Sequence, residues 1–170
     1  MKKISLKNLA ILASEKFKEH HLECILVGGA CVTIYSQNRY QSYDLDFVTY
    51  EDRGKIKSAL EELDFVQKGR YFHHPDSIFF IEFVTPPVSV GKETIKKYNH
   101  LGAIILLSAT DCVKDRLASF YYWNDRQALE QATMVCKAQK NVNLTEIKKW
   151  SILEGQQRKY EEFLQYLANQ

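Results

Sequence analysis

The sequence contains few of the residues that would assign it to a class at first sight. Its four cysteines form no C-x-x-C pair, and it has only three prolines and no low-complexity stretch. Without paired cysteines, a zinc site or a disulfide framework is disfavoured. We therefore expect Cys24, Cys31, Cys112 and Cys136 to be small core residues of a protein in a reducing compartment, the cytoplasm.

Long apolar runs and a strong excess of one charge are also missing. No run approaches the roughly 18 apolar residues of a membrane span, and the longest ones, residues 103–107 among them, have the length of a strand. The basic start, Met1-Lys2-Lys3, leads into an amphipathic segment, which is not the pattern of a signal peptide. A net charge of +2 gives no basic footprint over the whole chain, although a local patch remains open. We expect no membrane partner.

The chain has 170 residues, of which 45% are hydrophobic and 12% aromatic, and this composition suffices for one hydrophobic core. Apolar periodicity predicts helices over 6–19, 30–35 and 51–63, and strands over 23–27, 44–49, 65–72, 77–84, 88–90 and 101–107. Ser108 and Asp111 fit a capping box, after which the pattern is helical. The sequence predicts an α+β fold with a small mixed or antiparallel sheet. We expect one domain, 1–170, with an α+β part over 1–107 and a helical C-terminal part over 108–170.

Two carboxylates, Asp44 and Asp46, interrupt an apolar segment two residues apart. In a strand they project from the same face, while Leu45 and Phe47 enter the core. Two such charges repel each other unless a cation meets them, and carboxylate oxygens are ligands that suit Mg²⁺. Glu82, flanked by apolar residues in an aromatic strand, is a third acid that would complete a clamp for two metal ions.

A glycine pair, Gly28-Gly29, follows an apolar strand and precedes a short helix. Glycine lets the backbone approach a ligand closely, and the start of a helix can face a phosphate. Ser42, two residues before Asp44, can donate its hydroxyl to a phosphate oxygen, and Arg39 can neutralise phosphate charge. This pattern favours a nucleotide next to the carboxylates.

The glycine pair, the short helix, Ser42, Asp44-x-Asp46 and Glu82 together resemble the nucleotidyltransferase superfamily that includes DNA polymerase β. The likeness is greatest to its small bacterial branch, the minimal and the toxin–antitoxin or abortive-infection type nucleotidyltransferases. The resemblance implies that Gly28, Gly29 and Ser42 hold the triphosphate. It also implies that Asp44 and Asp46 bind Mg²⁺ and that Glu82 takes the third-acid position.

The same resemblance implies an activity: transfer of a nucleoside monophosphate from a nucleoside triphosphate, ATP being the expected one, to an acceptor hydroxyl, with two Mg²⁺ ions. The acceptor stays open between RNA, a protein and a small molecule, and a toxin–antitoxin role would add a partner protein. The tail motifs around Lys114-Asp115-Arg116 are similar to those of the toxin-like relatives, where a basic residue meets the nucleotide. Either Lys114 or Arg116 is the expected equivalent.

Other interpretations of the acidic motif exist. Two acids on an exposed edge strand would give the same pattern. Sugar transferases also use Asp-x-Asp, but they need a longer nucleotide-binding region than the 43 residues before Asp44. In haloacid-dehalogenase-like phosphatases the strand precedes the acids, whereas here it follows them. Finally, the protein could keep the fold without catalysis, as a nucleotide-binding or partner-binding module.

Overall fold

The structure, a computed structural model, describes residues 4–170, so the basic start at Met1–Lys3 lies outside the described residues. Its helices are α1 (Leu6–Glu19), α2 (Gly28–Tyr35), α3 (Arg53–Glu61), α4 (Ala109–Trp123), α5 (Arg126–Ala138), α6 (Leu144–Leu153) and α7 (Gln157–Ala168). Its strands are β1 (Ile25–Val27), β2 (Asp44–Val48), β3 (Val66–Lys68), β4 (Tyr71–His73), β5 (Phe80–Val84), β6 (Ser89–Val90), β7 (Glu93–Thr94), β8 (Asn99–Leu101) and β9 (Ile104–Leu106).

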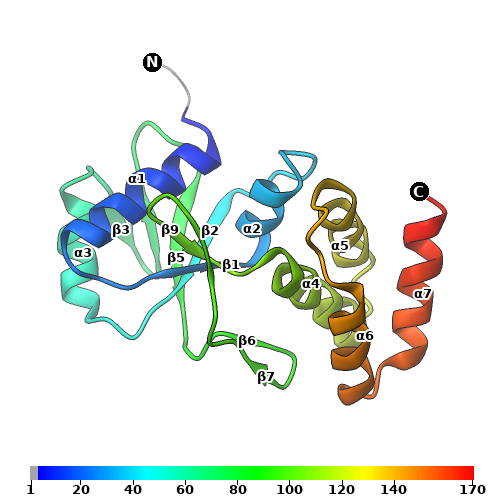
Figure 1. Ribbon diagram of the computed structural model, residues 1–170. Coiled ribbons are helices and arrows are strands. Elements are labelled where there is room, and N and C mark those ends of the chain that lie inside the picture. Colours follow the sequence, from blue (N-terminus) through cyan, green and yellow to red (C-terminus); the bar gives the residue numbers. More distant parts are fainter. Residues whose placement is uncertain (1–3) are drawn as a thin grey trace.

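Seven of these strands form one mixed sheet in the order β3-β4-β5-β2-β1-β9-β8. Pairs β2–β5 and β1–β9 are parallel and the other pairs are antiparallel, while β6 and β7 form a separate hairpin. The sheet with α1 and α3 lies on one side of the molecule, helices α4–α7 gather on the other, and α2 lies between them (Figure 1). The α+β class and the mixed sheet expected from the sequence are confirmed.

The helix starts follow the capping residues in the sequence. The amide of Asn8 donates to Ser5 Oγ at 3.2 Å, and the amide of Asp111 donates to Ser108 Oγ at 3.0 Å. Ser108 Oγ also donates to Asp111 Oδ2 at 2.9 Å, so both capping-box side chains take part in starting α4. Helix α3 begins two residues later than the predicted 51, because the Asp52 side chain accepts from the amide of Lys55 and makes Asp52 the cap.

Two segments predicted as single strands are hairpins in the structure. The run 65–72 divides into β3 and β4, and the run 101–107 belongs to a hairpin of β8 and β9. Each hairpin turns at a glycine in the left-handed region, Gly69 at φ +63° and Gly102 at φ +61°. A glycine adopts this conformation without the steric cost of a side chain, and it reverses the chain where the apolar pattern alone continues a strand.

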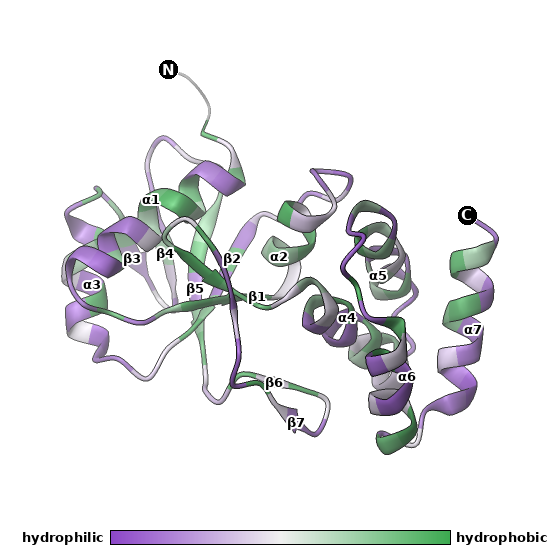
Figure 2. Cartoon of the chain, in the orientation of Figure 1, coloured by the Kyte–Doolittle hydropathy of each residue, from purple (hydrophilic) through white to green (hydrophobic). Residues whose placement is uncertain are grey.

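One face of the sheet packs against α1 and forms the core of the α+β part. Leu45, Phe47 and Ile81 are fully buried on this face. The ring of Phe17, from α1, meets the rings of Phe47 and Phe83 edge-on, with centroids 5.4 and 5.9 Å apart. Hydrophobic residues concentrate on the inner strands β1 and β9 (Figure 2).

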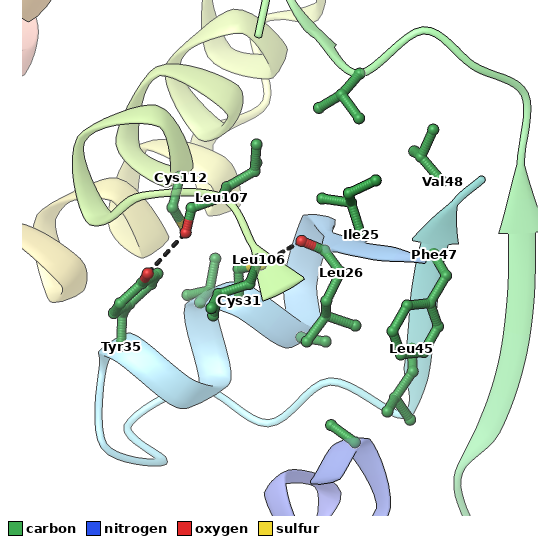
Figure 3. Close-up of a cluster of buried hydrophobic side chains, with 14 of the residues drawn as sticks. Ile25, Leu26, Cys31, Tyr35, Leu45, Phe47, Val48, Leu106, Leu107 and Cys112 are labelled. Atoms are coloured by element: carbon green, nitrogen blue, oxygen red, sulfur yellow. Dashed lines mark hydrogen bonds between the residues drawn. The ribbon is translucent and has the colours of Figure 1, made fainter. Parts of the chain in front are cut away.

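Helix α2 joins this core to the helical part. The Tyr35 hydroxyl donates to the carbonyl oxygen of Leu107 at 2.7 Å, and Cys31 Sγ donates to that of Leu26 at 3.2 Å (Figure 3). All four cysteines are free thiols, three of them buried and Cys136 partly exposed, as expected for core residues. Among residues 4–170, no helix combines the length and apolar composition needed to cross a membrane.

Lys114 anchors the helical part to the β6–β7 hairpin. Its side chain is 1% exposed, and its Nζ lies 2.7 Å from Glu146 Oε1, 3.1 Å from Glu93 Oε2 and 3.3 Å from Asp111 Oδ1. These three acids come from α6, β7 and α4, so one cation holds three elements together. We call these four residues the Lys114 cluster.

Replacing Lys114 by Met should lower the free energy of unfolding by about 2–3 kcal/mol, because the acids lose their shared cation. The loss stays below that of a fully buried pair, since the side chains of Glu93 and Glu146 are 44% and 50% exposed. Urea denaturation measures the change. Lys148→Met, an exposed lysine on α6 outside the hollow that the Lys114 cluster lines, is the control and should shift stability by less than about 0.5 kcal/mol. Equal midpoints for the two variants would show that the cluster is not stabilising.

Candidate functional site

The three predicted acids meet on the sheet face opposite the α1 core. Asp44 and Asp46 alternate with the buried Leu45 and Phe47 along β2, and both are partly exposed. In the parallel β2–β5 pair, Asp46 is the register partner of Glu82. Register partners share a face and adjacent strands lie about 4.8 Å apart, so the three carboxylates are neighbours.

The glycine pair borders this acidic cluster at very short range. A Cβ atom on Gly28 would lie 3.0 Å from Asp46 Oδ2, and one on Gly29 would lie 2.9 Å from Ser42 Oγ. Gly28 also has φ +67°, so a side chain there would be strained as well as crowded. Ser42 is buried and donates its hydroxyl to Asp44 Oδ1 at 2.6 Å. The structure therefore brings Gly28, Gly29 and Ser42 beside the acids.

Burial in this site, together with the neighbouring acids, raises the pKa of Asp46 to about 7. Burial is the largest cause, and the charges of Asp44 and Glu82 raise the pKa further. Arg116 acts in the opposite sense and lowers the pKa of Asp46, while its neighbour Asp115 raises it. The site thus carries more negative charge than its own cations neutralise.

Glu82 has a partner that the sequence analysis missed. Arg70 Nε lies 3.1 Å from Glu82 Oε1, and the arginine side chain is 68% exposed at the tip of the β3–β4 hairpin. Arg70 also donates to the Tyr71 hydroxyl at 2.6 Å. A glycine inside a strand pattern, Gly69, was the signal for a turn that would have exposed Arg70.

With Glu82 held by Arg70, the acids are neighbours without forming a ready metal cage. Among residues 4–170, no group of three or more histidine, cysteine, aspartate or glutamate side chains is arranged to hold a metal ion. Asp44 is likewise held by the Ser42 hydroxyl. The chemistry of the donor set nevertheless suits Mg²⁺, because it consists of carboxylate oxygens, one of them poorly compensated.

Of the two basic residues expected from the tail, Arg116 is the one whose charge acts on the acids. Its guanidinium is largely buried, pairs with Asp115 Oδ2 through Nε at 3.1 Å, and donates to Gln131 Oε1 at 3.4 Å. Lys114 is directed elsewhere, into the Lys114 cluster, where three carboxylates occupy its ammonium group. In this structure Lys114 thus serves the Lys114 cluster, and its contact with a nucleotide stays a prediction.

Arg39 also lies apart from its expected place. It is exposed in the turn after α2 and lines a surface hollow with residues of α5 and α7, among them Glu130, Lys137 and Tyr166. The turn continues past Ser36, whose hydroxyl accepts from the amide of Tyr40 at 3.3 Å. A side chain that borders α5 and α7 does not join the carboxylates of β2.

No protein-family model matches the sequence, and a search of the curated proteins returns no match. The candidate site therefore stands on its own geometry.

The raised pKa of Asp46 predicts a specific dependence of stability on pH. The folded protein keeps this proton up to about pH 7, whereas an unfolded aspartate loses it near 3.8, so stability falls as pH rises between these values. The loss is at most about 4 kcal/mol and is smaller where water reaches the carboxyl. Asp46→Asn lacks this titration. Without divalent cations, its stability advantage over wild type should therefore grow from about pH 4 to about pH 8.

Urea denaturation in the presence of a chelator, at several pH values, measures this difference. Asp76→Asn, at an exposed position between β4 and β5, is the matched control and should follow wild type throughout. A constant difference between Asp46→Asn and wild type at every pH would contradict the raised pKa.

Proposed function

We propose that the protein is a magnesium-dependent nucleotidyltransferase that moves a nucleoside monophosphate from a nucleoside triphosphate to an acceptor hydroxyl. The observation that carries this proposal is the meeting of Asp44, Asp46 and Glu82 on one sheet face beside Gly28 and Ser42. Each of these residues is a type that nucleotidyl transfer uses, and they come from three separate segments of the chain.

The excess negative charge of the acids favours binding of a cation. Burial and two neighbouring carboxylates raise the pKa of Asp46, and a divalent cation would remove that repulsion. Asp44, Asp46 and Glu82 would hold Mg²⁺, with Glu82 turning away from Arg70. When bound, Mg²⁺ supplies charge stabilisation at the transferring phosphate and its leaving group.

The other residues of the site would bind and orient the triphosphate. Gly28 and Gly29 have no side chains to keep phosphate oxygens away from the backbone, and they open α2. The Ser42 hydroxyl can exchange its bond to Asp44 for one to a phosphate oxygen. Arg116 supplies a fixed positive charge from α4, and Glu82 is the carboxylate that would take the proton of the acceptor hydroxyl, directly or through water.

A second candidate, a binding module without catalysis, is favoured by a different observation. Arg70 pairs with Glu82 and Ser42 donates to Asp44, so two of the three acids are compensated without a metal. In such a protein Asp46 would be a structural acid. The two candidates differ in what magnesium and ATP together do to stability.

We predict that ATP with Mg²⁺, but neither alone, raises the melting temperature of wild type by about 5 °C or more at a hundredfold excess over Kd. Asp46→Asn should gain much less and should lose transfer of radiolabel from α-labelled nucleoside triphosphates to any acceptor in a cell lysate. The charge that recruits the cation is removed at nearly constant volume. Thermal melts and labelling measure the two effects, with Asp76→Asn as the matched control.

The binding-module candidate gives the opposite pattern. There, Asp46→Asn is less stable than wild type without metal, both proteins respond equally to Mg²⁺ with ATP, and no label is transferred. That set of results would exclude nucleotidyl transfer at these acids.

A further inference from the structure

The sheet face that carries the acids continues beyond them to the β3 edge. Partners in register share a face, so two rows of side chains run across β2, β5, β4 and β3. The first row is Asp46, Glu82, Tyr71 and Lys68, and the second is Asp44, Phe80, His73 and Val66. The acids therefore border a surface made of aromatic and basic side chains.

The aromatic residues of this surface contact one another. The ring centroids of Tyr71 and Phe80 are 5.1 Å apart and those of His73 and Phe80 are 5.5 Å apart. All three rings are partly exposed, in contrast to Phe72 and Ile81 on the opposite face, which are buried. We call Tyr71, His73 and Phe80 the aromatic face.

Basic groups border the aromatic face in two places, beside the acids and at the β3 edge. The guanidinium of Arg70 lies over the Tyr71 ring, 4.9 Å from its centroid, while its Nε contacts Glu82. Lys68 is exposed at the end of the first row. An arginine that is 68% exposed and held by one carboxylate oxygen keeps donors free for another anion.

The aromatic face and the glycine pair lie on opposite sides of the acids, which indicates which substrate approaches from each side. This argument rests on the proposed function. In the strand order, β4 lies on one side of the acid-bearing pair β5–β2 and β1 lies on the other. Gly28 and Gly29 follow β1, so a triphosphate held there approaches from the β1 side. The attacking and leaving oxygens of a phosphoryl transfer lie roughly in line, so the acceptor comes from the β4 side.

We propose that the aromatic face binds the acceptor and that the acceptor is single-stranded nucleic acid. An unpaired base near its terminal hydroxyl stacks on Tyr71 and Phe80, and the adjoining phosphate is met by Arg70. Stacking on aromatic side chains accepts any base, and the arginine fork matches phosphate oxygens. A polycationic small molecule would be repelled by Arg70 and Lys68. A net charge of +2 suits a footprint of a few nucleotides rather than a long duplex.

In the transfer step, the terminal hydroxyl oxygen forms a bond to the α-phosphorus of the triphosphate. The bond between this phosphorus and the oxygen bridging to the β-phosphate breaks, and pyrophosphate leaves with the electron pair. The hydroxyl proton passes to the Glu82 carboxylate. Because Glu82 leaves Arg70 when it holds Mg²⁺, the guanidinium of Arg70 is then free to meet the acceptor phosphate.

The test is fluorescence polarisation with a fluorescein-labelled eight-nucleotide single-stranded RNA at low salt. Arg70→Ala and Tyr71→Leu should each weaken binding about fivefold or more, because one loses the phosphate contact and the other the stacking ring. Arg53→Ala is the matched control: Arg53 is exposed on α3 and lines a hollow with Phe72 and Phe83, on the opposite face. It should bind within about twofold of wild type, since a surface substitution on that side leaves the aromatic face intact.

Three further measurements make the outcome decisive. Thermal melts of each variant test whether the fold is kept. In these melts, Arg70→Ala should retain the gain in melting temperature that wild type shows with Mg²⁺ and ATP. Excess ATP without metal should leave the RNA bound, and its displacement would assign the aromatic face to the base of the triphosphate instead. Radiolabel from a lysate should enter nucleic acid, and label in protein alone would overturn the proposal.

The results also separate this inference from the proposed function. Unchanged RNA binding by both variants, with a normal response to Mg²⁺ and ATP, overturns the acceptor assignment alone. Weakened RNA binding by both variants, with no response to Mg²⁺ and ATP, removes nucleotidyl transfer and leaves the aromatic face as a nucleic-acid-binding surface.

Discussion

The parallel pairing of β2 with β5 is the constraint on which the rest of the structure depends. It sets Asp46 opposite Glu82 and, on the reverse face, Phe47 beside Phe83, whose rings stack with centroids 6.0 Å apart. A slip of one residue would turn the carboxylates into the core and the rings into solvent. Burial of the apolar face therefore fixes the position of the acids on the other, and the site is a consequence of core packing.

The acids are kept in this position by partial compensation. Ser42 donates to Asp44, Arg70 pairs with Glu82, and the charge of Arg116 acts on Asp46. None of these partners removes the raised pKa of Asp46, which burial causes first and the charges of Asp44 and Glu82 increase. A fold that keeps an unfavourable charge arrangement gives up stability there, and such trade-offs are common where a site binds ligands.

The helical part contributes to the site through one residue and to stability through another. Arg116 and Lys114 are two positions apart on α4, so they point to different sides of the helix. Lys114 holds Glu93 and Glu146, from the hairpin and from α6, whereas Arg116 lies with Asp115 on the side whose charges act on Asp46. One helix thus fixes the hairpin with one side chain, and the charge of another lowers the pKa of Asp46.

Local sequence determined the features that depend on near neighbours. Alternation along residues 44–48 placed both aspartates on one face, and Ser5 and Ser108 set the starts of α1 and α4. Short-range patterns are reliable here because strand alternation and helix capping involve residues within four positions of each other.

Only the tertiary structure decided which distant groups meet. Arg70 reaches Glu82 because Gly69 turns the chain and the β4–β5 register sets Tyr71 opposite Glu82. The partners of Lys114 in β7 and α6 are 21 and 32 residues away in sequence. The sequence therefore could not predict whether this lysine would bind a nucleotide or form ion pairs that stabilise the fold. Pairings of this kind follow from register and packing, which are set by the whole core and not by any one segment.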